Sequence, residues 1–254
     1  MAALPHPPTP PRAHRSWWRA LTPATLLARL LPQACYLCAA PAGRHVLCPA
    51  CAAALPALSA ARCPCCALPS PGGQRCGACL SHPPAFDATW AALAYSGGVE
   101  HLVHGLKYRH RLALAPALGQ MLLATLPAPP ALDCLIPLPL HASRLRGRGF
   151  NQAMEIARPL ARAWRLPLWP LAAVRERDTT PQATLPWKAR QANIRGAFRV
   201  ERPLSGLRVG VVDDVMTTGA TLHAFAQALK DRGATHVTNL VVARTLPGHG
   251  RESG

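Results

Sequence analysis

The sequence is short of acidic and aromatic side chains. Only 11 of its 254 residues are Asp or Glu, against 28 Lys and Arg, which gives a formal net charge of +17. A charge of this size favours anionic partners such as nucleic acid, pyrophosphate groups or acidic lipid, and does not choose among them. Aromatic residues make up 5% of the chain. Few platforms are therefore present on which the bases of single-stranded DNA could stack, which weighs against a protein that only binds single strands.

The sequence also lacks a long apolar run. The longest uncharged stretch, residues 112–132, contains Pro116, Pro127, Pro129 and Pro130, so a membrane-spanning helix is not expected. The first residues are rich in proline and include no apolar core of the length that a secretory signal needs. We therefore expect a cytoplasmic protein that does not span a membrane.

Cysteine, by contrast, is abundant and regularly spaced. Eight of the ten cysteines form four C-x-x-C pairs, and the first two pairs recur in the next two with a shift of 28 positions. Such a repeat indicates two copies of one unit. A C-x-x-C turn directs two thiolates at one metal ion, and two turns complete a tetrahedron, so the simplest assignment is two structural zinc sites from consecutive pairs. The eight predicted ligands are Cys35, Cys38, Cys48, Cys51, Cys63, Cys66, Cys76 and Cys79.

The same spacing leaves alternatives open. In a cross-braced arrangement the first pair would bind metal with the third and the second with the fourth. Loss of metal from some pairs would leave one zinc ion instead of two, and Cys65, between Cys63 and Cys66, could compete as a ligand. Disulfides are disfavoured by the expected cytoplasmic location, and redox chemistry rarely needs four C-x-x-C copies. Because the positions have the character of closed structural ligands, no zinc catalysis is expected.

Residues 209–221, reading VGVVDDVMTTGAT, predict a buried strand, a tight loop and the start of a helix. In an open α/β sheet the carboxyl end of a strand opens onto the ligand crevice. Threonine hydroxyls, a glycine and a helix start suit a phosphate, whereas Asp213 and Asp214 suit a ribose diol beyond it. The Walker A lysine is absent, and the alternative is an ordinary strand-to-helix turn capped by threonine. The predicted loop comprises Val215, Met216, Thr217, Thr218, Gly219, Ala220 and Thr221.

Two segments before this motif predict the first strand and helix of the main domain. Residues 86–96 are expected to form a strand, and residues 99–126 a helix that is interrupted near Pro116. The basic section at residues 107–111 is a candidate contact for an anion, or else a solvated helix end.

A second strand end carries a basic loop. Residues 134–140 predict a short apolar strand, followed by Arg144, Arg146 and Arg148 in a loop that suits a pyrophosphate. Beyond it we expect a helix at 149–165, a strand at 168–174, a long polar segment at 175–198, a motif helix reaching Arg232 with Gly233 as its cap, and a last strand at 236–243.

The stretch VVDDVMTTGAT resembles the motif by which type I phosphoribosyltransferases bind 5-phosphoribosyl 1-pyrophosphate (PRPP). The resemblance implies that Asp213 and Asp214 bind the ribose hydroxyls, that the threonine loop surrounds the 5′-phosphate, and that Mg²⁺ accompanies PRPP. It also implies a flexible hood at residues 175–198, with Thr180, Gln182, Arg190 and Asn193 as candidate contacts. The implied pyrophosphate loop comprises Pro137, Leu138, Pro139, Leu140, Arg144 and Arg148.

Over residues 35–246 the chain resembles the ComF family. The resemblance rests on the four C-x-x-C pairs and on the segments RGRGFNQA, RDTTPQATL, RQANIRGAF and VVDDVMTTGAT. It implies an N-terminal zinc module and a phosphoribosyltransferase-like domain, and bacterial members are linked to competence and to use of external DNA. The extra cysteine in the third pair, Cys65, departs from the pattern.

We therefore expect an α/β protein with a phosphoribosyltransferase-like open, mostly parallel sheet, flanking helices and a small cysteine-rich zinc module. The expected function is that of a phosphoribosyltransferase, a glycosyltransferase connected with DNA uptake, although no residue is an obvious general base for an acceptor. The alternatives are a non-catalytic protein that handles single-stranded DNA together with DNA-uptake proteins, and an adaptor with a vestigial pocket. The expected divisions are a disordered tail at 1–15, a short helix at 16–31, a double zinc-ribbon-like module at 32–84, the phosphoribosyltransferase-like domain at 85–246 and a tail at 247–254.

Overall fold

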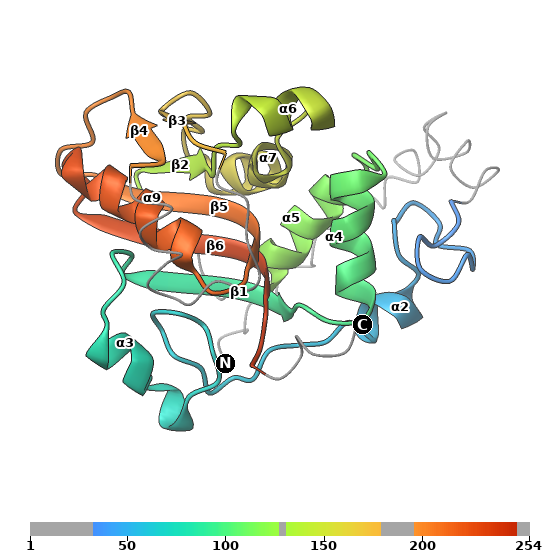
Figure 1. The fold of residues 1–254 in the computed structure, drawn as a ribbon. Helices are drawn as coiled ribbons and strands as arrows, with labels where there is room; N and C mark the ends of the chain where they lie inside the picture. Colours follow the sequence, from blue (N-terminus) through green and yellow to red (C-terminus); the bar gives the residue numbers. More distant parts are fainter. Residues whose placement is uncertain (1–32, 127–130, 179–195, 248–254) are drawn as a thin grey trace, which may run out of the picture.

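The centre of the fold is a parallel β-sheet. The computed structural model describes residues 33–126, 131–178 and 196–247. In this part of the chain, four parallel strands pair in the order β1–β6–β5–β2 (Figure 1). The prediction of an open, parallel α/β sheet is therefore confirmed. The strands are β1 (Ala88–Ala94), β2 (Cys134–Pro137), β5 (Arg208–Met216) and β6 (His236–Arg244).

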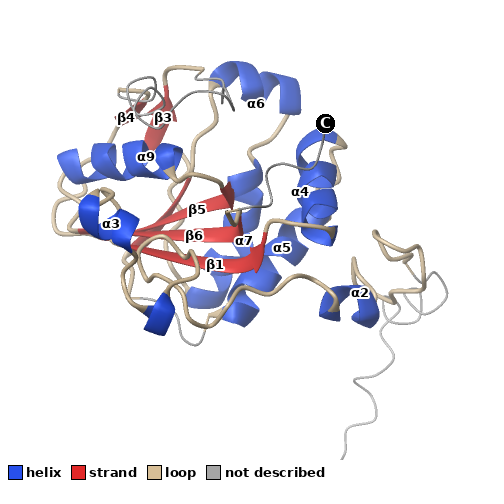
Figure 2. Ribbon diagram, turned by 60° about the horizontal axis from the view of Figure 1, so that its bottom comes forward, coloured by secondary structure: helices blue, strands red, loops and turns tan. Residues whose placement is uncertain are grey.

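Helices cover both faces of this sheet (Figures 1 and 2). One face packs against α4, α5 and α7, where Leu102, Leu118 and Ile156 belong to one buried core. The other face packs against α9 through Phe225 and Leu229. Strands buried on both faces are expected to be apolar throughout, as β5 and β6 largely are. The helix bounds are α4 (Gly98–Tyr108), α5 (Leu114–Thr125), α7 (Gln152–Trp164) and α9 (Ala220–Asp231).

The single helix predicted for residues 99–126 is two helices. The chain leaves α4 after Tyr108 and enters α5 at Leu114, and His110 between them has a φ of +51°. The interruption predicted near Pro116 is therefore present, but it lies at residues 109–113, before the proline. Pro116 occupies the first turn of α5, where its missing N–H has no intrahelical partner to lose.

The basic loop predicted after the second strand is also a helix, α6 (Ala142–Arg148). His141 caps its start by accepting the N–H of Ser143 at Nδ1, over 3.3 Å. Gly149 ends it in the left-handed conformation, with a φ of +77°. None of its residues is buried, so the sequence carried no apolar period to mark it.

A two-stranded antiparallel sheet joins the ends of the polar segment. It consists of β3 (Ala173–Arg175) and β4 (Phe198–Val200). The strand predicted at 168–174 was wrong in extent, because Leu168 makes only an isolated bridge with Leu135 and β3 begins at Ala173. The candidate hood contacts Thr180, Gln182, Arg190 and Asn193 lie outside the described residues.

The cysteine-rich segment folds as two copies of one unit, as the repeat of 28 positions predicts. An isolated bridge joins Ala34 to Pro41 in the first copy, and its counterpart joins Arg62 to Pro69 in the second, 28 positions later. A short helix follows at the same offset in each copy. The short helices are α2 (Pro49–Ala53), the 3₁₀-helix η2 (Pro71–Gly73) and α3 (Gly77–Ser81).

The two copies lie against different parts of the main domain. In the first copy, the ring of Tyr36 lies so close to Gly105 of α4 that any side chain there would collide with it. In the second copy, the carbonyl of Pro64 accepts the N–H of Thr89 at 3.0 Å and so covers the edge of β1. Figure 2 shows α3 on the side of β1 and α2 on the side of α4 and α5.

Within the described residues, none of the helices is both long enough and apolar enough to cross a membrane. The predicted tail at 1–15 and the predicted helix at 16–31 lie outside those residues, as does all but the first residue of the tail at 247–254. The predicted domain bounds stay a prediction.

Candidate functional site

Two neighbouring carboxylates lie at the carboxyl end of the sheet. Asp213 and Asp214 belong to β5 and are 7% and 2% exposed. The sequence predicted that the strand ends at Val212, but the pairing with β6 extends β5 to Met216. The first two residues of the predicted loop, Val215 and Met216, are therefore strand residues, and both acids lie within β5.

Burial and proximity change the protonation of this pair. Removal from water and the neighbouring Asp214 raise the pKa of Asp213 to about 8, while Lys107 works in the opposite direction. The carboxylate of Asp213 accepts the N–H of Asp214 at 2.8 Å. Ionisation of Asp213 beside Asp214 is therefore unfavourable in the free protein, and a bound cation or ligand can favour it.

The acid pair has a lysine partner that the sequence did not reveal. Lys107, near the end of α4, places its Nζ 2.9 Å from Oδ2 of Asp214. Burial of the ammonium opposes its charge, but Asp214 and Asp213 outweigh burial and raise the pKa of Lys107. The signal in the sequence was the basic stretch 107–111, which we interpreted as a contact for an anion or as a solvated helix end. The chain itself provides that anion in Asp214.

The threonine-rich loop begins at Thr217. Thr217 and Thr218 are exposed, and Gly219 has a φ of +81°, where a Cβ would meet the side chain of Met216. The hydroxyl of Thr218 accepts the N–H of Ala220 at 3.4 Å, at the start of α9. The amides of Thr217, Thr218 and Gly219 have no acceptor within the described residues. Free amide donors at a helix N-terminus suit an anion.

The end of β2 lies directly beside the acids. Pro137 is in register with Val212, the residue before Asp213. The N–H of Leu138 donates to the carbonyl of Val212 at 2.9 Å and continues this pairing. The predicted pyrophosphate segment that begins at Pro137 and the acid pair therefore occupy adjacent strand ends, which is where open α/β sheets bind their ligands.

Arg144, predicted to contact pyrophosphate from a loop, lies on α6 and pairs with the chain's own Asp178. Its Nε lies 2.9 Å from Oδ1 of Asp178, and the hydroxyl of Ser143 donates to Oδ2 at 2.7 Å. The Ser143 hydroxyl and the charge of Arg144 hold the pKa of Asp178 below its ordinary value. Asp178 thereby joins the beginning of the polar segment 175–198 to α6.

Arg148 lies in a small aromatic patch where α6 meets α4. Its Nη1 donates to the side chain of Gln152 at 2.5 Å, and its guanidinium lies 5.8 Å from the ring centroid of Tyr108. Beside it, the rings of His110 and Phe150 lie 6.1 Å apart. We name Tyr108, His110, Arg148 and Phe150 the α4–α6 face. Tyr108 is 63% exposed, so its ring is available to a ligand.

Arg175 is a second cation that sequence reasoning missed at this site. It ends β3 and forms a bridge with His141, the residue that caps α6. Burial and the nearby Arg144 lower the pKa of Arg175, whereas Asp178 and Asp213 raise it. Arg175 is therefore within electrostatic range of the acid pair. The pairing of β3 with β4 and the bridge to His141 bring it there, and no local motif marks it.

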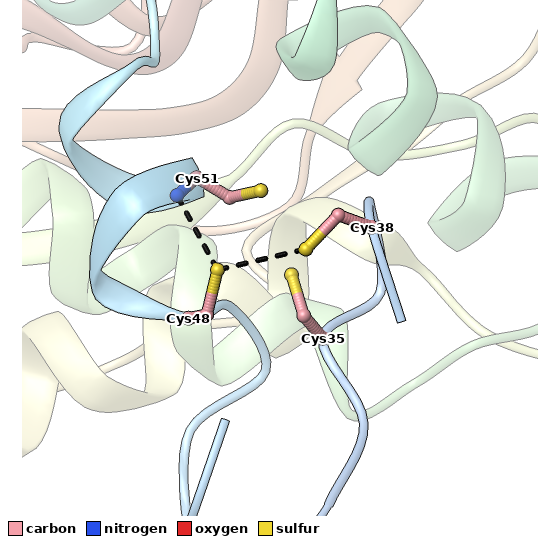
Figure 3. A group of neighbouring side chains, drawn as sticks. All are labelled: Cys35, Cys38, Cys48 and Cys51. Carbon is pink, nitrogen blue, oxygen red and sulfur yellow. Dashed lines mark hydrogen bonds between the residues drawn. The ribbon is translucent and has the colours of Figure 1, made fainter. Parts of the chain in front are cut away.

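The four cysteines of the first copy converge on one point (Figure 3). The Sγ atoms of Cys35, Cys38, Cys48 and Cys51 lie within 4.8 Å of one another. Sγ of Cys48 lies 3.6 Å from Sγ of Cys38 and accepts the N–H of Cys51 at 3.4 Å. The N–H of Cys48 lowers the pKa of Cys35 to about 6, which favours the thiolate that a metal binds.

The second copy repeats this arrangement with Cys63, Cys66, Cys76 and Cys79. Consecutive pairs therefore share a site, and the cross-braced alternative is wrong. Cys65 does not join the group: its Sγ donates to the carbonyl of Phe86 at 3.7 Å, and burial raises its pKa. The competition expected from Cys65 is therefore absent from this site.

Both groups have the donor set and the spacing of a tetrahedral zinc site. Zn–S bonds of about 2.3 Å place the sulfur atoms about 3.8 Å apart. The observed separations are 3.6 Å between Cys38 and Cys48 and 3.7 Å between Cys66 and Cys76. Four thiolates leave no open coordination position, so both sites are structural.

The chain matches two protein-family models. Residues 26–80 match the model described as a double zinc ribbon domain, and residues 146–252 match the model described as a phosphoribosyl transferase domain. The first match covers both cysteine clusters, and the second covers the acid pair and the threonine loop. The chain therefore carries two structural zinc sites and a phosphoribosyltransferase-type fold.

Known proteins resemble it over much of its length. It is 35% identical to the DNA utilization protein YhgH of Salmonella typhi over 229 residues, covering 85% of this chain and 99% of that one. It is 29% identical to Competence protein F of Haemophilus influenzae over 178 residues, covering 65% of this chain and 76% of that one. Among solved structures, the glutamine phosphoribosylpyrophosphate amidotransferase of B. subtilis is 22% identical with a TM-score of 0.35, covering 50% of this chain and 25% of that one.

Proposed function

The chain belongs to the ComF family, and on that premise we propose that it binds PRPP together with Mg²⁺ and acts as a phosphoribosyltransferase in the use of external DNA. The observation that carries this proposal is the placement of Asp213 and Asp214 between the threonine loop and the end of β2. The link to DNA rests on the names of its relatives, a DNA utilization protein and a competence protein.

The residues present suit the parts of PRPP. The free amides at Thr217 and Thr218 suit the 5′-phosphate, and the two carboxylates suit the ribose hydroxyls. Oxygen donors are also what Mg²⁺ prefers, and the acid pair supplies them. When bound, Mg²⁺ would share the negative charge that develops on the departing pyrophosphate.

Cations around the acid pair suit the leaving group. Lys107 neutralises Asp214 in the free protein, at 2.9 Å, and is released to other anions when a ligand takes that carboxylate. Arg144 and Arg175 lie at the start of α6 and the end of β3, near the strand end assigned to pyrophosphate. Catalysis on this arrangement is electrostatic and positional, with cations fixed before charge develops.

Calorimetric titration of the zinc-loaded protein with PRPP, with and without Mg²⁺, tests the proposal. We expect binding in the micromolar range that needs Mg²⁺. The double variant Asp213→Asn, Asp214→Asn keeps the shapes of both side chains and is expected to bind roughly a hundredfold more weakly, a loss of about 2.7 kcal/mol. Equal affinity in the two proteins, both shown to be folded, would assign PRPP to another place or to none.

The α4–α6 face favours a second candidate function, the binding of single-stranded DNA. Exposed Tyr108 is flanked by Arg148 at 5.8 Å, and Phe150 contacts His110. The segments that form this face, residues 104–112 and 141–151, contain six Lys or Arg residues and no acid. Cations beside a stacking ring are what proteins use to hold single strands without regard to sequence.

We expect a fluorescent oligo-dT to bind with an affinity that falls steeply as salt increases. Tyr108→Ala is expected to weaken binding by roughly tenfold, because base stacking contributes about 1–3 kcal/mol. The double Asn variant should bind DNA as tightly as the wild type, since removing negative charge does not weaken a phosphate contact. If Tyr108→Ala leaves the affinity unchanged, the α4–α6 face is not the DNA site.

A further inference from the structure

Arg244 is a buried arginine at the carboxyl end of the sheet. It ends β6, in register with Met216 of β5 and Ala94 of β1, and is 3% exposed. Within the described part of the chain, its hydrogen bonds go to backbone carbonyls and none goes to a carboxylate. A buried guanidinium is costly unless it is bonded and its charge is balanced. The burial of the Arg244 guanidinium therefore needs a structural explanation.

The hydrogen bonds of Arg244 join two regions that are far apart in the sequence. Its Nε donates to the carbonyl of Cys66, in the second cysteine cluster, at 2.8 Å. Its Nη1 donates to the carbonyls of Met216 at 3.0 Å and Thr245 at 2.9 Å, and also to that of Thr217. One side chain thus connects a cysteine of the second cluster to the beginning of the threonine loop.

These bonds fix the direction of the loop amides. In a trans peptide the C=O and the N–H of the same unit point to opposite sides, and the described residues contain no cis peptide bond. Arg244 holds the carbonyl of Thr217 inward, and it holds the carbonyl of Met216 together with the N–H of Thr245, which donates to that carbonyl at 3.0 Å. The N–H groups of Thr217 and Thr218 therefore face away from it. Those are amides without an acceptor within the described residues. Arg244 therefore orients the donors that suit a phosphate.

The second cluster balances the charge of Arg244. Four thiolates around one Zn²⁺ carry two negative charges in excess. The guanidinium of Arg244 lies against this cluster, with Nε 2.8 Å from the carbonyl of Cys66. The loaded cluster is thus the counter-charge that the buried arginine otherwise lacks.

We propose that Arg244 is a positioning residue that couples the second zinc cluster to the phosphate loop. Zinc on the second cluster holds the backbone of Cys66 and the arginine in place, and the arginine holds the amides of Thr217 and Thr218 toward the ligand. The identity of that ligand rests on the proposed function, whereas the coupling is a property of the loop and the cluster themselves.

Arg62 offers a matched control. It also belongs to the second copy, and its Nη1 donates to the carbonyl of Ala91 in β1 at 3.1 Å. It therefore joins the same module to the same sheet without touching the loop. Arg244→Lys and Arg62→Lys both keep the positive charge, and both replace a branched donor by a single ammonium.

Hydrogen exchange measured by mass spectrometry on the full-length, zinc-loaded proteins tests the coupling without any ligand. We expect loop exchange, reported by the amides of Ala220 and His223 that donate to Thr218 and Gly219, to be roughly tenfold faster in Arg244→Lys and unchanged in Arg62→Lys, since exchange reports local opening. Native mass spectrometry should count two zinc ions in each protein. Unchanged loop exchange in Arg244→Lys, or an equal rise in Arg62→Lys, would overturn the proposal.

Reciprocal coupling gives a second readout that general loss of stability would not move. If the cluster strengthens ligand binding, the ligand must strengthen zinc retention by the same factor. At equilibrium with a zinc-selective chelator, PRPP with Mg²⁺ should raise the affinity for one zinc ion in the wild type and in Arg62→Lys, and not in Arg244→Lys. An equal rise in all three proteins would contradict the coupling. A wild type that binds no PRPP would instead contradict the proposed function, and hydrogen exchange would still decide the role of Arg244.

Discussion

Cys66→Ser is expected to lower the free energy of unfolding by about 5 kcal/mol. The reason is that the unfolded chain has no preformed zinc site, so the free energy of zinc binding adds to the free energy of folding. Cys38→Ser, the equivalent change 28 positions earlier, is expected to have a far smaller effect on the main transition. The two substitutions remove the same ligand from two copies of one unit. The repeat therefore provides its own matched pair.

The difference is expected because the second copy is buried more completely in the core of the main domain. Cys63, Cys65 and Ala67 are fully buried and share one core with Phe225 of α9. The backbone of this copy also covers the edge of β1 through Pro64. Loss of its zinc would expose that core and that edge together.

The first copy also belongs to a core of the main domain, through Cys35, Leu47 and Cys48, but its Cys38 is exposed whereas the equivalent Cys66 is buried. Its ring of Tyr36 and the side chain of Leu37 lie against α4, at Gly105 and Gly98, while Cys38 itself is exposed. A unit of this kind can open alone while the sheet stays folded. Loss of its zinc should therefore appear as local unfolding.

Denaturant unfolding followed by tryptophan fluorescence, together with zinc counts by native mass spectrometry, measures the difference. Each variant should retain one zinc ion, so that equal metal loss accompanies unequal loss of stability. Equal destabilisation by the two serines would show that both copies support the sheet to the same extent. A larger loss of stability in Cys38→Ser than in Cys66→Ser would show that the first copy, and not the second, supports the core of the main domain.

The sequence predicted those parts of the fold that repeat or carry an apolar pattern. The 28-residue period predicted two like units, and the consecutive assignment of ligands agrees with the structure. The apolar run before Asp213 predicted a buried strand. The end of that strand was wrong, because pairing with β6 and not local sequence carries β5 on to Met216.

Other features depend on contacts that a linear pattern does not carry. Helix α6 buries no residue and is fixed by the His141 cap, so the run of arginines and glycines predicted a loop. The pairing of Lys107 with Asp214 spans 107 positions and exists only because α4 packs on the face beside β5. Arg175 reaches the site through a strand pairing whose partner follows the polar segment. The motif thus predicted the residues of the candidate site, while the fold determined which charged groups lie beside them.

Asp213→Asn is expected to stabilise the folded protein by about 5 kcal/mol at pH 8, since the pKa of Asp213 rises from 3.8 to about 8 on folding and each unit corresponds to about 1.4 kcal/mol. The cause is the buried position of Asp213 beside Asp214, which raises its pKa to about 8 in the folded state. The folded protein therefore holds this proton more tightly than the unfolded chain does. Below the ordinary carboxyl pKa of about 4, Asp213 is protonated in both the folded and the unfolded state, so it does not lower the free energy of unfolding. Between pH 4 and 8 the destabilisation caused by Asp213 grows, and above pH 8 it is constant.

Denaturant unfolding at pH 5 and pH 8 tests the sign of this linkage. The advantage of the Asn variant should be small at pH 5 and largest at pH 8, and its side chain can still accept the N–H of Asp214 as the wild type does at 2.8 Å. A variant less stable than the wild type at pH 8 would mean that Asp213 is ionised in the free protein and that a neighbouring positive charge stabilises its carboxylate. Higher stability of the variant at pH 8, together with loss of PRPP binding, would show that the carboxylate of Asp213 lowers folding stability and is needed to bind the ligand.

Deprotonation of Asp213 also predicts that the Mg²⁺-dependent affinity for PRPP increases as the pH rises toward 8, because a cation and two hydroxyl donors favour the ionised pair.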